Sequence, residues 1–302
     1  IIQNNTIDMK TVRNHGEALY ANNTPIYING TGDVLIANNK IKAGDSIVTN
    51  SAGTEALSYA IRTYYKSGKL LILNNLILGG NCSNNLDSSQ ETSGGIRIIM
   101  QENTSPDSAD EIYVVNNTVI QNSTNTYIIY GIGMTSAYAD ISYPPYIENN
   151  LIHLYGVVHG AVCMLEAANG NGYISPISVS NNACSNQAVA TDKNIYQDDR
   201  GGSVVVSVDD LNTVIQNGIY GSGTLASWGN VGEDASNIFV NLTGPDGDIT
   251  TFSDNNWQLK ATAHRYFRQG GKDLSSTLSS ILSGFGLASY TDLEGISRTA
   301  VV

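Results

Sequence analysis

The chain has 302 residues, with 15 basic and 27 acidic side chains, a formal net charge of −12 and a charged fraction of 14%. So low a charged fraction excludes a highly charged disordered chain, and the acidic balance argues against nucleic acid as a partner. The 34 asparagines and 30 glycines favour turns and left-handed backbone over helix interiors, which excludes a mostly helical protein.

Neither a disulfide framework nor a membrane span is expected from the sequence. The three cysteines, Cys82, Cys163 and Cys184, include no metal-type Cys-x-x-Cys pair, and we interpret them as small buried apolar residues. The chain contains no run of about 18 apolar residues that would span a membrane. Residues 1–10 lack the features of a signal peptide and have the pattern of a strand that enters a turn. We therefore expect the chain to begin inside a larger protein.

A unit made of a strand, an asparagine pair and a second strand recurs along the chain. In order, its copies span residues 1–8, 35–42, 71–78, 113–120, 146–153 and 178–185. Successive copies begin 34, 36, 42, 33 and 32 residues apart, and a degraded seventh copy follows at 210–217. Such a period indicates a repeat architecture in which each copy packs on its neighbours.

A second apolar motif precedes most of the asparagine pairs by about 20 residues. It occurs at 16–21, 54–60, 94–100, 127–134 and 160–167. Each period therefore contains at least three short strands, and no helix long enough to cross back over a parallel sheet. Stacking such units about 4.8 Å apart predicts an all-β coil of parallel strands, a β-solenoid of about seven to eight turns.

The asparagine pair has a physical reason at the corner between two strands. One residue there must adopt left-handed backbone angles, which asparagine tolerates better than any residue except glycine. Where the same corner recurs, the second asparagines can stack, with their amides hydrogen-bonded along the coil. We predict an internal ladder of Asn5, Asn39, Asn75, Asn117, Asn150 and Asn182.

These motifs resemble a known family, the right-handed parallel β-helix proteins with pectate-lyase-like repeats of the secreted bacterial type. GGIRI at 94–98, followed by EIYVVNNTVIQN at 111–122, is similar to the recurring turn of that family. The resemblance covers roughly residues 1–220. It implies a right-handed coil, secretion or display at the bacterial surface, and a polysaccharide nearby. It does not imply catalysis, since the fold also carries adhesins and stalks.

The last segment resembles the closing region of secreted members of that family. The resemblance rests on NIFVN at 237–241, DNNWQLKATA at 254–263, GGKDL at 270–274 and TDLEGISR at 291–298. We expect one domain, in which residues 1–235 form the β-helix and 236–302 cap its open C-terminal turn. Within the cap, residues 274–284 are predicted to form a short amphipathic helix that ends at Gly284.

The lyases within this family indicate candidate catalytic residues. In lyases of this family, acidic residues on adjacent turns hold calcium, and an Arg or Lys removes the proton α to a uronic carboxyl group. Glu17 and Glu55 occupy matching places in GEAL and TEAL, with Arg97 one turn further. A one-residue slip would turn Arg97 to the opposite face. On this interpretation the cofactor is calcium, held between carboxylates about 5 Å apart, and a solvated ladder of charges is the alternative.

Two further groups of polar residues are candidate metal sites. His153 and His159 have two glutamates nearby, but their spacing matches no short zinc motif and favours ordinary loop and surface histidines. The segments DDR at 198–200 and PDGD at 245–248 carry carboxylates that suit calcium, although such clusters are commoner as turn formers.

Tyrosine dominates the aromatic residues, with 17 of them against 2 Trp and 4 Phe. A tyrosine ring presents an apolar face to a sugar ring and a hydroxyl to its polar edge, which suits a shallow glycan-binding groove. Tyrosine also suits strands and half-buried loops, so a purely structural role is the alternative. The candidate sugar-binding residues are Tyr127, Tyr130, Tyr138, Tyr143 and Tyr146.

We therefore expect an extracytoplasmic bacterial β-helix protein that binds or processes a polysaccharide or surface glycan along its lateral face. Binding without turnover is favoured, because no turn shows several acids beside an Arg or Lys. Any catalysis would be that of a glycoside hydrolase or of a calcium-dependent polysaccharide lyase that cleaves uronates by β-elimination. A non-catalytic structural or adhesin module is the other alternative.

Overall fold

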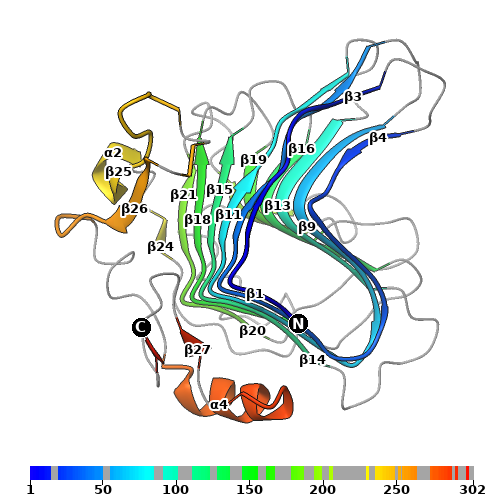
Figure 1. The fold of residues 1–302 in the computed structure, drawn as a ribbon, viewed down its shortest axis with the longest axis vertical. Coiled ribbons are helices and arrows are strands. Elements are labelled where there is room, and N and C mark those ends of the chain that lie inside the picture. The colour runs from blue at the N-terminus through cyan, green and yellow to red at the C-terminus, as the bar shows by residue number, and fades with distance from the viewer. Residues whose placement is uncertain are drawn as a thin grey trace.

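In the computed structural model, the chain forms strands that wind into a coil (Figure 1). The structure describes residues 1–14, 20–49, 55–84, 91–100, 111–122, 128–136, 145–155, 161–166, 178–186, 194–198, 204–206, 229–230, 235–248, 251–252, 254–263, 273–287, 290–291 and 297–298. Within these ranges, strands recur in the same order from one turn to the next.

The asparagine pairs set the main corner of the coil. The first asparagine of each pair has φ between 52° and 59°, in the left-handed region that few residues with a side chain enter. This conformation ends one strand and sends the next in a new direction, so that two sheets meet along the corner. The residues that adopt it are Asn4, Asn38, Asn74, Asn116, Asn149 and Asn181.

The sheet before the corner contains six parallel strands, one from each turn. Its strands are in register, so that Ile72 lies beside Ile36 on one side and Val114 on the other. Its members are β1 (Ile2–Gln3), β6 (Val34–Ala37), β10 (Lys69–Leu73), β14 (Glu111–Val115), β17 (Tyr146–Glu148) and β20 (Ser178–Ser180).

The sheet after the corner continues each turn with another parallel strand. Its members are β2 (Thr6–Asp8), β7 (Lys40–Lys42), β11 (Leu76–Gly79), β15 (Thr118–Asn122), β18 (Leu151–Tyr155), β21 (Ala183–Asn186) and β24 (Gly229–Asn230). Beyond it lies a small parallel sheet from the first three turns, made of β3 (Val12–Asn14), β8 (Ser46–Val48) and β12 (Cys82–Asn84).

A sheet of long, bent strands closes the coil, and we call it the curved sheet (Figure 1). Its strands pair in parallel, except for the antiparallel pair at its end, β22 with β23. Its members are β4 (Tyr20–Asn23), β5 (Ile26–Thr31), β9 (Glu55–Ser67), β13 (Glu91–Met100), β16 (Ile128–Ser136), β19 (Ala161–Glu166), β22 (Asn194–Asp198) and β23 (Val204–Val206).

This arrangement confirms the predicted all-β solenoid of stacked parallel sheets. The sheet before the corner counts six strands among the described residues, and β24 adds a seventh strand to the sheet after it. The number of described turns is therefore somewhat lower than the number predicted from the repeat.

The second asparagines form the predicted ladder inside the corner. From Asn5 to Asn150, each Nδ2 donates to the Oδ1 of the asparagine one turn later, at distances between 2.9 and 3.1 Å. The backbone N–H of each asparagine donates to the same Oδ1. From Asn39 onward, each Nδ2 also donates to a backbone carbonyl of the preceding turn. The buried amides are thereby satisfied. The ladder joins Asn5, Asn39, Asn75, Asn117, Asn150 and Asn182.

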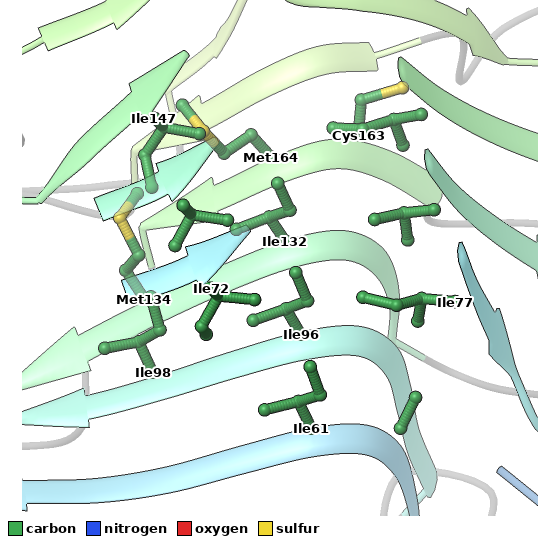
Figure 2. Close-up of a cluster of buried hydrophobic side chains, with 14 of the residues drawn as sticks. Ile61, Ile72, Ile77, Ile96, Ile98, Ile132, Met134, Ile147, Cys163 and Met164 are labelled. Atoms are coloured by element: carbon green, nitrogen blue, oxygen red, sulfur yellow. The ribbon is translucent and has the colours of Figure 1, made fainter. Parts of the chain in front are cut away.

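Aliphatic side chains from all sides pack the interior of the coil (Figure 2). Because the parallel strands are in register, equivalent residues stack into columns, such as Ile61, Ile96 and Ile132 of the curved sheet. Ile72 and Ile77, from the two sheets that meet at the corner, belong to the same core. Burial of these columns supplies the hydrophobic free energy that stabilises the coil.

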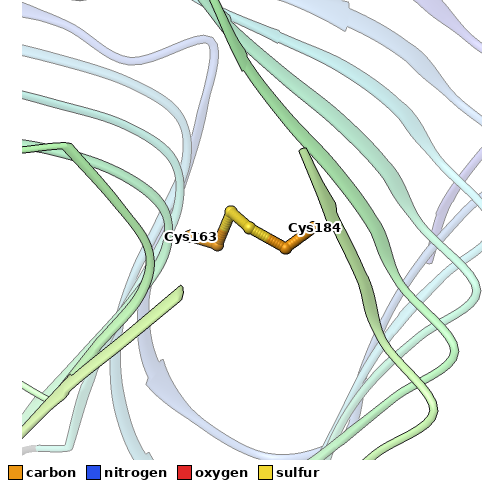
Figure 3. Close-up of a disulfide and its surroundings, with 2 residues drawn as sticks. All are labelled: Cys163 and Cys184. Carbon is orange, nitrogen blue, oxygen red and sulfur yellow. A yellow bond between two sulfur atoms is a disulfide. The ribbon is translucent and has the colours of Figure 1, made fainter. Parts of the chain in front are cut away.

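A disulfide crosses the interior of the coil (Figure 3). It joins Cys163 of β19 to Cys184 of β21, and both residues are fully buried. The prediction of unpaired cysteines is wrong for this pair, because residues 21 positions apart come to face each other across one turn. Cys82 fits the prediction better: it is buried, and its thiol donates to the carbonyl oxygen of Thr92 at 3.2 Å.

The C-terminal segments pack against the sides of the coil. The helix α2 (Ala235–Ile238) and the antiparallel strands β25 (Phe239–Asn241) and β26 (Asn256–Leu259) contribute to a cluster with the outer side chains Leu78 and Ile120 of the sheet after the corner. They lie beside that sheet in Figure 1.

The predicted amphipathic helix is present as α4 (Ser275–Gly284). Its buried side chains Leu278 and Ile281 pack on Leu35 and Leu71, which face outward from the sheet before the corner. The helix thus covers the outer side of the sheet before the corner, over strands of the second to fourth turns, and it lies beside that sheet in Figure 1. The short antiparallel pair β27 (Tyr290–Thr291) and β28 (Ser297–Arg298) follows it.

Replacing a ladder asparagine in the middle of the row tests its contribution to stability. We expect Asn117→Ala to lower the free energy of unfolding by about 2 to 4 kcal/mol, because the backbone N–H of Asn75 and one of its Nδ2 protons lose their acceptor, and the Oδ1 of Asn150 loses one of its two donors. Urea unfolding followed by circular dichroism measures the loss. The control is Asn29→Ala, at an exposed residue outside the ladder, for which we expect a change within about 0.5 kcal/mol. Equal effects of the two substitutions would contradict the ladder.

Alkylation with and without reduction tests the disulfide. In denaturant without reductant, we expect one alkyl group per chain, on Cys82, and after reduction three, as the mass will show. Three groups without reduction would rule the bond out.

The double variant Cys163→Ser with Cys184→Ser is expected to lose about 3 kcal/mol of unfolding free energy, since the bond closes a loop of moderate length.

Candidate functional site

The curved sheet bends where the alternation of its side chains breaks. In β9 the adjacent residues Ala60 and Ile61 both belong to the interior core, although neighbouring strand residues ordinarily face opposite sides. The strand therefore turns there, with its concave side outward (Figure 1). Gly95 lies at the equivalent place in β13, where a Cβ would lie 2.3 Å from the side chain of Val119. Gly95 therefore lets β13 approach the opposite sheet more closely than a side chain would allow.

A groove of about 630 Å³ lies at the outer side of this bend. The strands β5, β9 and β13 line it with side chains that alternate with core residues and therefore point away from the interior. We call it the outer groove. Its charged and aromatic lining residues are Tyr27, Glu55, Arg62, Tyr64 and Arg97.

Two arginines lie next to each other in the outer groove. Arg62 and Arg97 are paired in the parallel register of β9 and β13. Their guanidiniums lie over the ring of Tyr59, at 5.4 and 5.2 Å from its centroid. Arg97 donates a hydrogen bond to the Tyr59 hydroxyl, and Arg62 donates one to the Tyr64 hydroxyl. Cation–π contacts and hydrogen bonds thus hold two like charges in place.

Tyr130 completes the aromatic floor beside the arginines. Its ring stacks on Tyr59 with the centroids 6.2 Å apart. Gly94 and Gly133 make room for the ring, since a Cβ on either would lie within 2.5 Å of it. Burial raises the pKa of Tyr130 well above its ordinary value. Burial alone would lower the pKa of Arg97, but the neighbouring Tyr130 and Tyr59 hydroxyls outweigh it and raise this pKa overall.

Of the predicted catalytic residues, Glu55 and Arg97 both line the outer groove, and Glu17 lies outside the described residues. Their register differs from the expected one. Glu55 pairs with Tyr20 of β4, and Arg97 pairs with Arg62. Glu55 and Arg97 therefore line the groove from the two arms of a bent sheet, and do not form one column of matching positions.

Two of the five candidate sugar-binding tyrosines are described. Tyr130 is only 3% exposed, so it supports the groove from beneath. Tyr146 lies on another sheet, where it stacks on Tyr113 with the ring centroids 4.7 Å apart and packs against the cluster under α4. The other three, Tyr127, Tyr138 and Tyr143, lie outside the described residues.

Sequence reasoning does not reveal Arg62 or Tyr27 as groove residues. A signal for Arg62 exists, because AIRT at 60–63 and GIRI at 95–98 share an Ile-Arg pair. Aligning the two segments on that pair places the arginines side by side. Tyr27 carries no comparable signal, since its place in the groove follows from the bend of the sheet.

Within the described ranges, no three His, Cys, Asp or Glu side chains gather as metal ligands would. His153 is buried beside Phe239, and His159 lies outside these ranges. In the PDGD segment, Asp246 stabilises a turn by accepting the backbone N–H of Asp248 and the hydroxyl of Thr251, each at 2.8 Å. The expectation of calcium therefore gains no ligand set from the described residues.

Comparison with protein-family models, curated proteins and solved structures finds no match for this chain. In the part of the chain that the structure describes, no helix has both the length and the apolar character needed to traverse a bilayer. The geometry of the outer groove is therefore the basis for assigning a function.

The buried His153 makes stability depend on pH. His153 belongs to β18 and is buried beside Phe239. This burial lowers its pKa to about 4, against 6.5 for an exposed histidine. Between these values the unfolded chain binds the proton and the folded chain does not, so stability falls as the pH drops from 6.5 to 4. The full loss is about 3 kcal/mol. Urea unfolding at several pH values should show a shallower dependence for His153→Gln, and identical slopes would contradict the assignment.

Proposed function

We propose that this chain is an extracytoplasmic bacterial β-helix protein that binds polysaccharide along its lateral face, in the outer groove. The observation that carries the proposal is an aromatic wall beside charged hydrogen-bonding groups in a concave surface. Tyr27 is 49% exposed and packs on Tyr64 with the ring centroids 5.8 Å apart. Such rings suit the apolar face of a sugar, while Glu55 and the arginines suit its hydroxyls.

The position of the C-terminal segments supports this choice of face. The helix α4 covers outer side chains of the sheet before the corner, and the segment around β25 and β26 covers those of the sheet after it. Among the described lateral surfaces, the curved sheet keeps a concave face with aromatic side chains. Loops and grooves on a rigid scaffold are common places for binding sites.

The interior disulfide supports the extracytoplasmic location. Disulfides persist in oxidising compartments and are rare in the cytosol. The bond between Cys163 and Cys184 is buried within the coil, as expected of a structural bond and not of a reactive one. This agrees with the secretion that the resemblance to bacterial β-helix proteins implies.

A polysaccharide lyase is the second candidate, because Glu55 and Arg97 line the same groove. Proton abstraction would require a neutral arginine. The hydroxyls of Tyr59 and Tyr130 raise the pKa of Arg97 and so favour its charged form. Arg97 is therefore a poor base and a good binding group, and we favour binding without turnover.

Affinity electrophoresis in native gels that contain a panel of polysaccharides tests the proposal. We expect retardation by at least one glycan, and weaker retardation for Tyr27→Ala and Tyr64→Ala. Each ring should account for about two-fold to twelve-fold in affinity, since an aromatic contact contributes about 0.5 to 1.5 kcal/mol. Val240→Ala, which truncates an exposed apolar residue of β25, is the matched control and should bind normally.

The outcomes separate the alternatives. Retardation that survives both tyrosine substitutions would place the binding site elsewhere. Release of unsaturated, ultraviolet-absorbing products from uronic-acid polymers, dependent on calcium, would establish the lyase in place of the binding protein. If no glycan retards the chain, the proposal fails and a structural or adhesin module becomes the better account.

A further inference from the structure

We infer that the outer groove contains an anion subsite, in which Arg62 and Arg97 together bind a carboxylate or sulfate group carried by the glycan. The inference rests on the proposed function and specifies that the bound glycan is negatively charged. The chain has 15 basic and 27 acidic side chains. In a chain with such an excess of acidic side chains, two adjacent guanidiniums in one groove form an unusual concentration of positive charge.

Neither arginine forms an ion pair with a described residue. The ion pairs within the described ranges join Lys42 to Asp8 at 3.5 Å and Lys69 to Glu111 at 3.2 Å. None of these four residues lines the outer groove. Glu55 does line it, but from the other arm of the bend and without an ion pair to either arginine. The positive charge of the pair is therefore not neutralised within the described chain.

The register brings these like charges into direct opposition. Paired residues of neighbouring parallel strands lie about 4.8 Å apart, and like charges at such positions destabilise a sheet. The side chains are held by Tyr59 and Tyr64, whose rings and hydroxyls are neutral partners. These contacts orient the guanidiniums without cancelling their charge. A bound oxyanion would cancel it, so the arrangement is better suited to the occupied groove than to the empty one.

An unpartnered donor points to the same ligand. The Nε of Arg62 is buried and makes no hydrogen bond with any described group. Buried N–H groups without partners are rare, and each calls for an explanation. A guanidinium presents its donors as a planar fork that matches two oxygens of a carboxylate or sulfate. Binding would turn the Arg62 guanidinium so that this Nε gains an acceptor, with Arg97 binding the same group from the next strand.

Paired polymers test the charge preference in the intact chain. We compare polygalacturonate with its methyl ester, and dextran sulfate with dextran, by affinity electrophoresis. At least one charged polymer should bind about ten-fold or more tightly than its neutral partner, as expected when a hydrogen bond gains a charge. Preference for polygalacturonate identifies the carboxylate, and preference for dextran sulfate identifies the sulfate ester.

Three substitutions link the preference to the groove. Arg62→Gln and Arg97→Gln should each remove most of the preference for the charged polymer. Arg13→Gln removes an exposed guanidinium of β3 outside the groove and should leave the preference intact. Circular dichroism and thermal unfolding check that the variants fold. If Arg97→Gln does not fold, Arg62→Gln alone tests the inference. Equal losses in all three variants, or no preference in the unchanged chain, would overturn the inference.

A titration with small anions separates this inference from the proposed function. Sulfate or acetate should shift the Nε–H proton resonance of Arg62, which is assigned by its disappearance in Arg62→Gln. If neutral glycans bind as well as charged ones and this resonance does not shift, the anion subsite is refuted while glycan binding stands. If the resonance shifts but no polysaccharide binds, the subsite stands and the proposed function fails.

Discussion

The structure depends on one local constraint, a corner at which an asparagine takes left-handed backbone angles and the next asparagine turns its amide inward. The first asparagine supplies the change of direction, with φ near 55° at Asn116 and its counterparts. The second supplies a donor and an acceptor that bond to its equivalents one turn away, and its donor also bonds to a backbone carbonyl of the preceding turn. A buried amide is costly without partners, so each turn stabilises the register of the next. The amide hydrogen bonds inside the corner therefore hold successive turns of the coil together.

A fixed register has consequences far from the corner. Residues at the same place in successive turns stack, which packs the aliphatic columns of the core and also brings Arg62 beside Arg97. Glycines act where the stacking becomes too close for a side chain. Gly95 lets the curved sheet approach the opposite strands, and Gly133 leaves space for the ring of Tyr130. The outer groove is thus a product of the register and of a few small residues, built on a rigid frame.

The asparagine period was sufficient to predict the parallel coil and its ladder, because the corner needs that residue type in every turn. It could not predict the register of the curved sheet, since the spacing from the corner varies between turns, and Glu55 pairs with Tyr20. The disulfide and the place of α4 depend on contacts across a turn that no local pattern shows. The sequence does carry one sign of a segment that covers the outer side of the coil. In β10 both faces are apolar: Leu70 packs in the core and Leu71 under α4, as a strand covered on both sides requires.

The most direct test of this account is the environment of the side-chain amides of Asn75, Asn117 and Asn150, measured by nuclear magnetic resonance with hydrogen exchange. The ladder predicts contacts between the amide protons of asparagines that lie 42 and 33 residues apart, together with exchange that requires unfolding of the coil. Amides that exchange at the rate of exposed side chains, and that contact only their neighbours in the sequence, would contradict the coil and the groove built on it.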